Sequence, residues 1–536
     1  MGIETALNLS LTPGVASRLA RHPLLTDAKP MREKVTSTYY DTPDLRLQRE
    51  SVVVSDRKRG STRLSSVSRL AQSGIRQAGH REWPLAGAPG ELDFSHVADH
   101  GLRQWLESVR EDLRPAFTTS VTRSAWLLEP RAGVRIELAL DRGWIEAEGR
   151  RQPICELGLE LLSGGVADLF SAAGELQSDL SLHPETTSLS QRGYRVLSEQ
   201  SLQVVKAPPV VIDAEMTAIG AFRTIARSCV RHLQSNEQGV RESDNPEFVH
   251  QARVAIRRLR SAIRVWKPLL PEEFVSNFDP LWQTLARQLG ETRNWDVFVG
   301  DTLPAIVAAF PASGEVDRLS HYARRRCTIN RQAARSALKS VDYSRLLLEF
   351  TAAVLALPVE GEARRVDAFA PRCLDKRAKQ VRHLADEALQ GDATARHSLR
   401  VAYKRLRYAL EFFAPLFPGE LLRHYHVAAS GLQELLGRLN DLAVASELIT
   451  EALPGEHGDV LRCWLAGQTD SLLPEFVVAL NETSTGMRYR GAISDTTVGS
   501  PPGMAWRPTA SHHGLLNQAA LASLPIFHLR QPFRLT

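Results

Sequence analysis

The sequence has no apolar run long enough to cross a membrane, and its first residues lack the basic and then apolar pattern of a secretory signal. Cysteine is scarce as well, because the 536 residues include only five, at positions 155, 229, 327, 373 and 463. Their odd number and wide spacing exclude a disulfide framework and a metal site built on cysteine pairs. We therefore expect a protein of the reducing cytoplasm that has no membrane partner.

The length and composition are those of a globular protein with more than one domain. Hydrophobic residues make up 43% of the chain and charged residues 24%, which are ordinary values for folded domains. The net charge of +5 is small for this length. The distribution of the basic residues along the chain is therefore more informative than their sum.

One stretch, residues 250–264, contains five arginines and lacks acidic residues, glycine and proline. Its alanine, leucine and arginine content favours a helix. At roughly 100° per residue, one face of this helix collects His250 and four arginines, while alanine, isoleucine and leucine occupy the other face. The basic face consists of His250, Arg253, Arg257, Arg260 and Arg264.

The same pattern returns 147 residues later, from His397 to Arg407. Two further signals return at the same spacing: residues 268–271, with a proline at each end, recur as residues 415–418, and the Leu-Gly pair at 289–290 recurs at 436–437. A repeat held in register over this distance indicates a duplicated helical unit.

A basic stripe of this kind has two readings, a solvated face or a binding surface. Solvated helix faces usually mix charges of both signs, because oppositely charged pairs one turn apart stabilise the helix. Here like charges follow one another in both copies, which costs helix stability. The duplicated arrangement favours a binding surface for a densely anionic ligand. Nucleic acid is the less favoured ligand, because the basic face lacks aromatic residues on which bases could stack.

The two copies resemble the conserved histidine α-helical domain, CHAD, over residues 213–480, because both keep the His-x-x-Arg and Arg-Leu-Arg elements. The resemblance implies two pseudo-symmetric helical bundles around a basic cavity that binds inorganic polyphosphate without a cofactor. Glu411 stands where the first copy has Arg264, so the second stripe is one cation shorter. The residues that the resemblance places in the cavity are His250, Arg253, Arg257, Arg260, Arg264, His397, Arg400, Lys404 and Arg407. On the preceding helix, the spacing of Arg223, Arg227 and Arg231 indicates a second basic stripe, in which Arg227 is an additional candidate phosphate contact.

The first 200 residues are predicted to be rich in strands. Residues 3–11, 134–141 and 155–161 alternate between apolar and polar residues, as strands with one buried face do. Charged residues on the polar side of such strands suit a closed barrel with a polar interior. Helices are expected at about 13–22, 95–109 and 165–179.

This half resembles the CYTH, or triphosphate tunnel, family, through residues 37–43, Phe117 to Thr119 with Arg123, residues 134–141 and 156–160, and Arg192 to Tyr194. The resemblance implies an inorganic triphosphatase that uses Mg²⁺ or Mn²⁺ bound by carboxylates. The departures are that Ala6 and Asn8 follow Glu4 where the family has an acid and a lysine, and that Gly158 replaces a carboxylate. The possible metal ligands that remain are Glu4, Glu137, Asp141, Glu156 and Glu160, and the possible phosphate contacts are Arg57, Arg123 and Arg192.

The predicted organisation is a multidomain chain, α+β and then all-α. An antiparallel β-barrel with helices spans 1–205, and a pseudo-two-fold pair of helical bundles spans 213–482, with repeats at about 213–355 and 365–482. Prolines at 208 and 209 mark the linker. Residues 293–296 are expected to open a new helix after the Leu-Gly pair. The tail, 484–536, loses periodicity and is expected to be disordered.

The leading hypothesis is that the helical half binds polyphosphate, with the barrel as a degenerate scaffold or weak phosphate site. The alternative is a metal-dependent triphosphatase in the barrel, and the losses at residues 6, 8 and 158 argue against it. We expect a cytoplasmic protein associated with polyphosphate granules. The sequence leads to no expectation about the oligomeric state.

Overall fold

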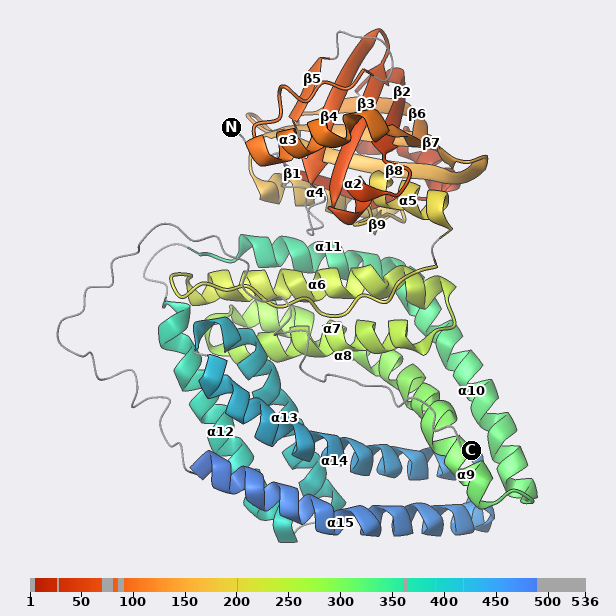
Figure 1. Cartoon of the computed structure of the whole chain (residues 1–536), viewed down its shortest axis with the longest axis vertical. Helices are drawn as coiled ribbons and strands as arrows, with labels where there is room; N and C mark the ends of the chain where they lie inside the picture. The colour runs from red at the N-terminus through yellow and green to blue at the C-terminus, as the bar shows by residue number, and fades with distance from the viewer. Residues whose placement is uncertain are drawn as a thin grey trace, which may run out of the picture. The chain divides into compact units, whose positions relative to one another are not determined.

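The computed structural model describes residues 5–26, 28–69, 81–84, 91–199, 201–359, 364–390, 392–417 and 419–488. A strand-rich part comes first in the chain and a helical part follows (Figure 1). The predicted disordered tail lies outside these residues, apart from 484–488, which belong to the last helix.

The strand-rich part is built on one antiparallel sheet of nine strands, in the order β5-β4-β3-β2-β6-β7-β8-β1-β9. The predicted antiparallel architecture of this part is confirmed. The three strands expected from alternation are present as β1, β7 and β8. The strands are β1 (Thr5–Ser10), β2 (Met31–Asp41), β3 (Val52–Arg59), β4 (Thr62–Arg69), β5 (Arg81–Pro84), β6 (Arg114–Leu128), β7 (Arg135–Ala147), β8 (Arg150–Ser163) and β9 (His183–Pro184).

Five α-helices accompany the sheet in the described part of this region: α1 (Pro13–Leu19), α2 (Arg46–Arg49), α3 (His100–Val109), α4 (Val166–Asp179) and α5 (Leu189–Ser198). Local signals set their starts, as at α1, where Thr12 accepts a hydrogen bond from the backbone of Val15 and Pro13 occupies the first turn. The helices expected near 13–22, 95–109 and 165–179 are therefore present as α1, α3 and α4.

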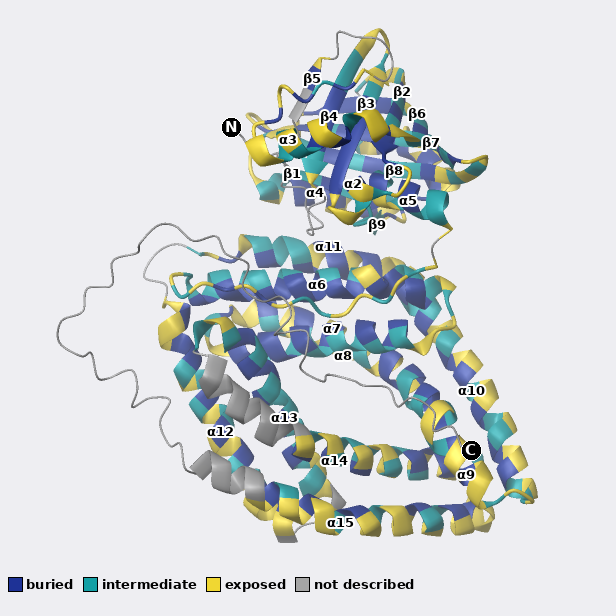
Figure 2. Cartoon of the chain, in the orientation of Figure 1, coloured by how far each residue is buried: buried dark blue, intermediate teal, exposed yellow. Residues whose placement is uncertain are grey.

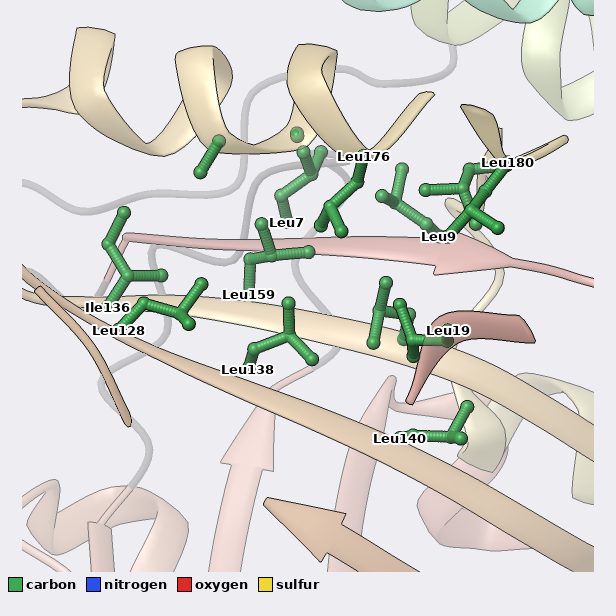
Figure 3. Close-up of a cluster of buried hydrophobic side chains, with 14 of the residues drawn as sticks. Leu7, Leu9, Leu19, Leu128, Ile136, Leu138, Leu140, Leu159, Leu176 and Leu180 are labelled. Carbon is green, nitrogen blue, oxygen red and sulfur yellow. The ribbon is translucent and has the colours of Figure 1, made fainter. Parts of the chain in front are cut away.

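Alternation along the strands separates an apolar face from a polar face. Leu7 and Leu9 of β1 pack with Leu138, Leu159 and Leu176, the last from α4, in a buried cluster (Figure 3). Their neighbours on β1, Ala6, Asn8 and Ser10, point to the other face by the two-residue period of a strand. The register pairs those three residues with Glu160, Gly158 and Glu156 of β8. Glu137 and Asp141 of β7, which pair in register with Glu160 and Glu156 of β8, thus lie on this polar face.

The second part is all-α, as predicted. Its α-helices are α6 (Ala218–Glu242), α7 (Pro246–Trp266), α8 (Glu272–Val297), α9 (Leu303–Ala309), α10 (Gly314–Lys339), α11 (Val341–Ala356), α12 (Val366–Gln390), α13 (Ala393–Phe413), α14 (Gly419–Ala452) and α15 (Asp459–Arg488). Of the described helices, none is both long and apolar enough to span a membrane. Figure 2 shows that α6 is mostly buried or intermediate, whereas α15 carries exposed residues along much of its length.

The duplication seen in the sequence is kept in the helix boundaries. The bounds of α7 and α13 differ by 147 residues at both ends, and the short 3₁₀ turn after each helix keeps that spacing. The bounds of α6 and α12 differ by 148 residues at both ends, so one residue fewer separates α12 from α13 than separates α6 from α7. The basic helix α7 begins as predicted, with Asn245 as the N-cap and Pro246 in the first turn.

One prediction in this region is wrong. Residues 293–296 do not open a new helix, because α8 continues from Glu272 to Val297 through the Leu-Gly pair. A glycine inside a helix costs only about 1 kcal/mol relative to alanine. Leu289, next to the glycine, and Trp295, within residues 293–296, are both buried, and their packing offsets that cost.

Candidate anion-binding site

The two basic helices bring cations of both repeats together. Arg253 and Arg257 lie on α7, and Arg400 and Lys404 are their counterparts on α13. The four charges are close enough to act on one another, since Arg257 lowers the pKa of each of the other three. We call these four residues the shared cluster.

Lys404 is the most perturbed member of the shared cluster. Burial, and then repulsion by Arg400, Arg257 and Arg253, lowers the pKa of its amine to about 6. Burial, and then Arg257, Arg400 and Arg293, lowers the pKa of Arg253 to about 10. These shifts mean that the protein holds the positive charges together at a cost in free energy.

His250 and Arg293 adjoin the shared cluster. Burial, and then Arg293, lowers the pKa of His250 to about 4, with Arg257 and Arg253 acting in the same direction. Arg293 also acts on Arg253. The sequence analysis predicted only a helix start at Arg293 and missed it as a member of this basic group. The signal that could have found it is its position on α8, three residues after Gly290, because residues three apart lie on the same face of a helix and Arg253 contacts Gly290.

Few groups offset the charge of the shared cluster. Arg253 donates to the carbonyl of Gly290 at 3.3 Å, and Arg400 donates to the side-chain oxygen of Asn440 at 2.6 Å. Among the described residues, the carboxylate of Asp441 raises the pKa values of Arg253, Arg400 and Lys404. Within the described part of the chain, the buried Nε atoms of Arg257 and Arg400 have no hydrogen-bond partner. The cluster therefore keeps an excess of positive charge and unused donors.

The other basic residues predicted for the cavity have surroundings that differ from those of the shared cluster. Arg260 donates to Asp279 at 2.9 Å and to Gln283 at 2.9 Å, so a carboxylate already neutralises it. Arg264 lies 3.9 Å from the same Asp279. Arg407 lies over the ring of Tyr408, with its guanidinium carbon 5.0 Å from the centroid, and His397 is exposed.

Arg227, the further contact predicted on α6, lines a cavity of about 280 Å³, and the residues that line this cavity do not include the shared cluster. The wall of this cavity includes Thr224, Arg231 and Gln234 of the same helix and Thr351 of α11.

On the polar face of the sheet, arginines neutralise the carboxylates that were candidates for metal ligands. Arg123 forms a bidentate pair with Asp141, at 2.8 and 2.7 Å, and its pKa is raised mainly by this hydrogen bonding. Arg192 pairs with Glu156, whose pKa is raised chiefly by burial. Glu137 raises the pKa of Arg123 electrostatically. Arg57 and Glu160 each have an interaction within the structure, and Glu4 lies outside the described residues.

The remaining carboxylates do not converge on a metal. Glu137 pairs in register with Glu160, and Asp141 with Glu156, but the row between them consists of Asn8, Gly158 and Ala139. Among the described residues, no group of three or more His, Cys, Asp or Glu side chains is arranged to hold a metal ion. The described residues of this face thus do not fit the Mg²⁺ or Mn²⁺ site that the CYTH resemblance implies.

Comparison with known proteins identifies the helical part. Residues 224–450 match the family model of the CHAD domain. The helical part is a CHAD domain. The predicted order, a CYTH-type domain followed by a CHAD domain, is confirmed, because the nine-stranded antiparallel sheet precedes it and a curated relative is an inorganic triphosphatase.

That relative, the "Inorganic triphosphatase" of Haemophilus influenzae, is 29% identical over 203 residues, which cover 37% of this chain and 56% of the relative. The chain thus spans about half the length of the curated relatives it matches. The crystal structure of the CHAD domain from the plant Ricinus communis has 29% identity and a TM-score of 0.46, covering 55% of this chain and 99% of that one. The structure of PptA from Streptomyces chartreusis has 14% identity and a TM-score of 0.39, covering 51% and 100%.

Proposed function

We propose that the CHAD domain binds inorganic polyphosphate through the shared cluster, Arg253, Arg257, Arg400 and Lys404. The observation that supports this proposal most is that α7 and α13 bring buried cations of both repeats together, while the buried Nε atoms of Arg257 and Arg400 have no hydrogen-bond partner among the described residues. A polyphosphate chain supplies closely spaced negative charges to both repeats at once. Arginine forks and a lysine ammonium are the donors that suit phosphate oxygens.

The chemistry needed for this binding is electrostatic, so we propose no cofactor for it. His250 and Arg293 would extend the contact surface on the side of α7 and α8. Binding of this polyanion would associate the protein with polyphosphate granules in the cytoplasm. Nucleic acid remains the less favoured polyanion, and competition between polyphosphate and RNA at one salt concentration separates the two.

The decisive experiment compares the parent with a variant in which all four residues of the shared cluster are replaced by alanine. We expect polyphosphate affinity to fall at least about 100-fold, because each hydrogen bond to a charged group contributes roughly 1.5–3 kcal/mol. Calorimetric titration measures this, and the parent's affinity should also fall steeply with salt as counterions are released.

A matched control removes the same number of charges from exposed residues, by replacing Arg318, Lys339, Arg345 and Lys379 with alanine. This control variant should bind polyphosphate almost like the parent. Equal losses in the two variants would show that net charge, rather than the shared cluster, holds the ligand.

A second candidate function is metal-dependent hydrolysis of triphosphate in the barrel. It is favoured by the 29% identity over 203 residues to the inorganic triphosphatase of Haemophilus influenzae. The internal pairing of Asp141 and Glu156 with arginines opposes it. We propose that the barrel is a scaffold or a weak phosphate site, with Mg²⁺ or Mn²⁺ required only if it hydrolyses triphosphate.

A further inference from the structure

The pseudo-two-fold repeat creates two equivalent places beside the shared cluster, and the chain has filled them differently. Each place is formed by one residue from the middle of the basic helix, one from the end of the other basic helix, and one from the helix before it. The 147-residue spacing makes Arg258 equivalent to Arg405, and Arg264 equivalent to Glu411. The 148-residue spacing of α6 and α12 makes Cys229 equivalent to Arg377.

The first place is electrically neutral. Arg258 is 1% exposed and forms an ion pair with Glu411 at 2.7 Å. Cys229, also 1% exposed, completes it, since both charged groups act on the thiol. An arginine of the first repeat is thus neutralised by an acid of the second.

The second place has three cations where the first has a cation, an acid and a thiol. Arg405 and Arg264 lie close enough that Arg405 lowers the pKa of Arg264, after burial and Arg260. Burial lowers the pKa of Arg377, and both Arg405 and Arg264 lower it further. The three guanidiniums come from α13, α7 and α12, and α12 packs along α13 (Figure 1).

Little in the described part of the chain neutralises these three arginines. The groups that act on Arg377 are Cys373, Arg405 and Arg264, and no described carboxylate is among them. The buried Nε of Arg405 has no hydrogen-bond partner among the described residues. Asp279 reaches Arg264 at 3.9 Å, but it also accepts from Arg260 at 2.9 Å. The second place therefore has an uncompensated positive charge.

We propose that Arg264, Arg377 and Arg405 form a second anion site, which binds one phosphate group on one side of the pseudo-two-fold axis. The bound phosphate takes the place that Glu411 holds in the other half. Three arginines with one shared, partly engaged carboxylate leave an excess of about two positive charges, which matches the charge of about −1.5 to −2 that a phosphate group carries at pH 7. The side chain of Arg264 is 37% exposed, so the site is open to a ligand from solution.

The source of the phosphate group is either free orthophosphate or one unit of a polyphosphate chain. The first source goes beyond the proposed function, and the second rests on it. The two differ in what they require of the shared cluster, because orthophosphate in the second site needs no contact with Arg253, Arg257, Arg400 or Lys404.

The test uses the full chain with Arg264→Glu, which introduces the residue found at the equivalent position 411. In phosphate-free buffer this variant should melt at a higher temperature than the parent, because an ion pair with Arg405 replaces a repulsion. In the parent, orthophosphate should raise the melting temperature in a saturable way at constant ionic strength, as a ligand of the folded state does. In the variant that increase should vanish. Lys379→Glu, the same charge change at an exposed residue of α12, should behave like the parent.

The four-alanine variant of the shared cluster should keep the orthophosphate effect, even if polyphosphate binding by the parent proves absent. Loss of polyphosphate affinity in Arg264→Glu would identify the polyphosphate chain as a source, and unchanged affinity would identify free phosphate. If Arg264→Glu does not fold, Arg377→Cys is tested in the same way, because cysteine is the residue at the equivalent position 229. Orthophosphate that leaves the parent's melting temperature unchanged, or that stabilises parent and folded variant equally, would overturn the proposal.

Discussion

At the scale of single residues, the repeat uses one position in two ways. Arg257 and Lys404 are equivalent, yet the lysine can lose its proton where the arginine keeps its charge. Burial among Arg400, Arg257 and Arg253 lowers the pKa of Lys404 to about 6, so the amine is mostly neutral at pH 7 in the free protein. A bound polyanion favours the charged amine, and binding is therefore coupled to protonation.

We predict that polyphosphate affinity increases as the pH falls from about 8 to about 6, and that binding at pH 7 takes up a proton. Calorimetry in two buffers that differ in ionisation enthalpy measures this uptake. Lys404→Arg, which introduces the residue of the other repeat, should bind with a flatter pH dependence. If the parent and Lys404→Arg show the same proton uptake, Lys404 is not the group that titrates.

The same pKa shift has a consequence for stability without ligand. The unfolded chain keeps a lysine pKa of about 10.4, whereas folded Lys404 has a pKa of about 6. Between these values the unfolded state binds more protons, so the contribution of this residue to the free energy of unfolding rises with pH. We predict that Lys404→Met removes this part of the pH dependence, and denaturant unfolding at pH 6, 7.5 and 9 measures the difference. A constant difference between parent and variant would contradict it.

At the scale of elements, the buried end of α7 joins the two repeats. Trp266 is fully buried, and its ring packs against Phe369 and Phe413 of the second repeat at centroid distances of 5.5 and 5.1 Å. Its indole N–H donates to the carbonyl of Ala218 at 2.7 Å, which also fixes α6. This packing stabilises α7 against the repulsion among its own arginines.

We predict that Trp266→Ala lowers the free energy of unfolding of the helical domain by about 3–5 kcal/mol, the usual cost of removing a buried tryptophan. Trp266→Phe should cost less, because phenylalanine is the residue at the equivalent position 413. Urea unfolding followed by the helical circular dichroism signal measures both variants. Similar losses for alanine and phenylalanine would show that the indole hydrogen bond, rather than the ring contacts, joins the repeats.

At the scale of the whole molecule, the polar face of the sheet and the shared cluster differ in how far their cationic side chains are paired with carboxylates. The polar face of the sheet pairs Arg123 and Arg192 with carboxylates, whereas the shared cluster of the CHAD domain gathers three arginines and a lysine with few carboxylates. A face that satisfies its own charges is poorly prepared for a metal and a triphosphate. This contrast is the physical reason why we propose anion binding in the helical domain and a scaffold role for the barrel.

We predict that the parent releases little phosphate from tripolyphosphate with Mg²⁺ or Mn²⁺, and that restoring Glu at 6, Lys at 8 and Glu at 158 increases the release. A side chain at 158 is accommodated, because the nearest atom to its Cβ would be the Asn8 oxygen at 3.6 Å. A phosphate-release assay on the full chain, with and without chelator, measures both proteins. Parent turnover in the usual enzyme range of roughly 1–1000 per second would contradict the scaffold role.

The sequence by itself was sufficient to predict the architecture and the equivalence of the shared-cluster residues in the two repeats. Periods of two and 3.6 residues, together with caps such as Asn245 and Pro246, are local properties, so the strands and the basic helices could be predicted from them. The exact 147-residue spacing of α7 and α13 also follows from the sequence, because a duplication is visible without coordinates. This spacing predicted which residues of the two repeats would be equivalent.

Only the tertiary structure decided which of the equivalent residues remain available to a ligand. Arg260 and Arg264 share the face of Arg253 and Arg257, but the fold brings Asp279 of α8 to Arg260, while Arg253 and Arg257 face Arg400 and Lys404. The fold likewise gives Arg258 an acid from the other repeat and gives Arg405 another arginine. A helical period specifies the direction of a side chain from its own axis. The charge that it meets there depends on the helices that pack against it, which no local pattern in the sequence specifies.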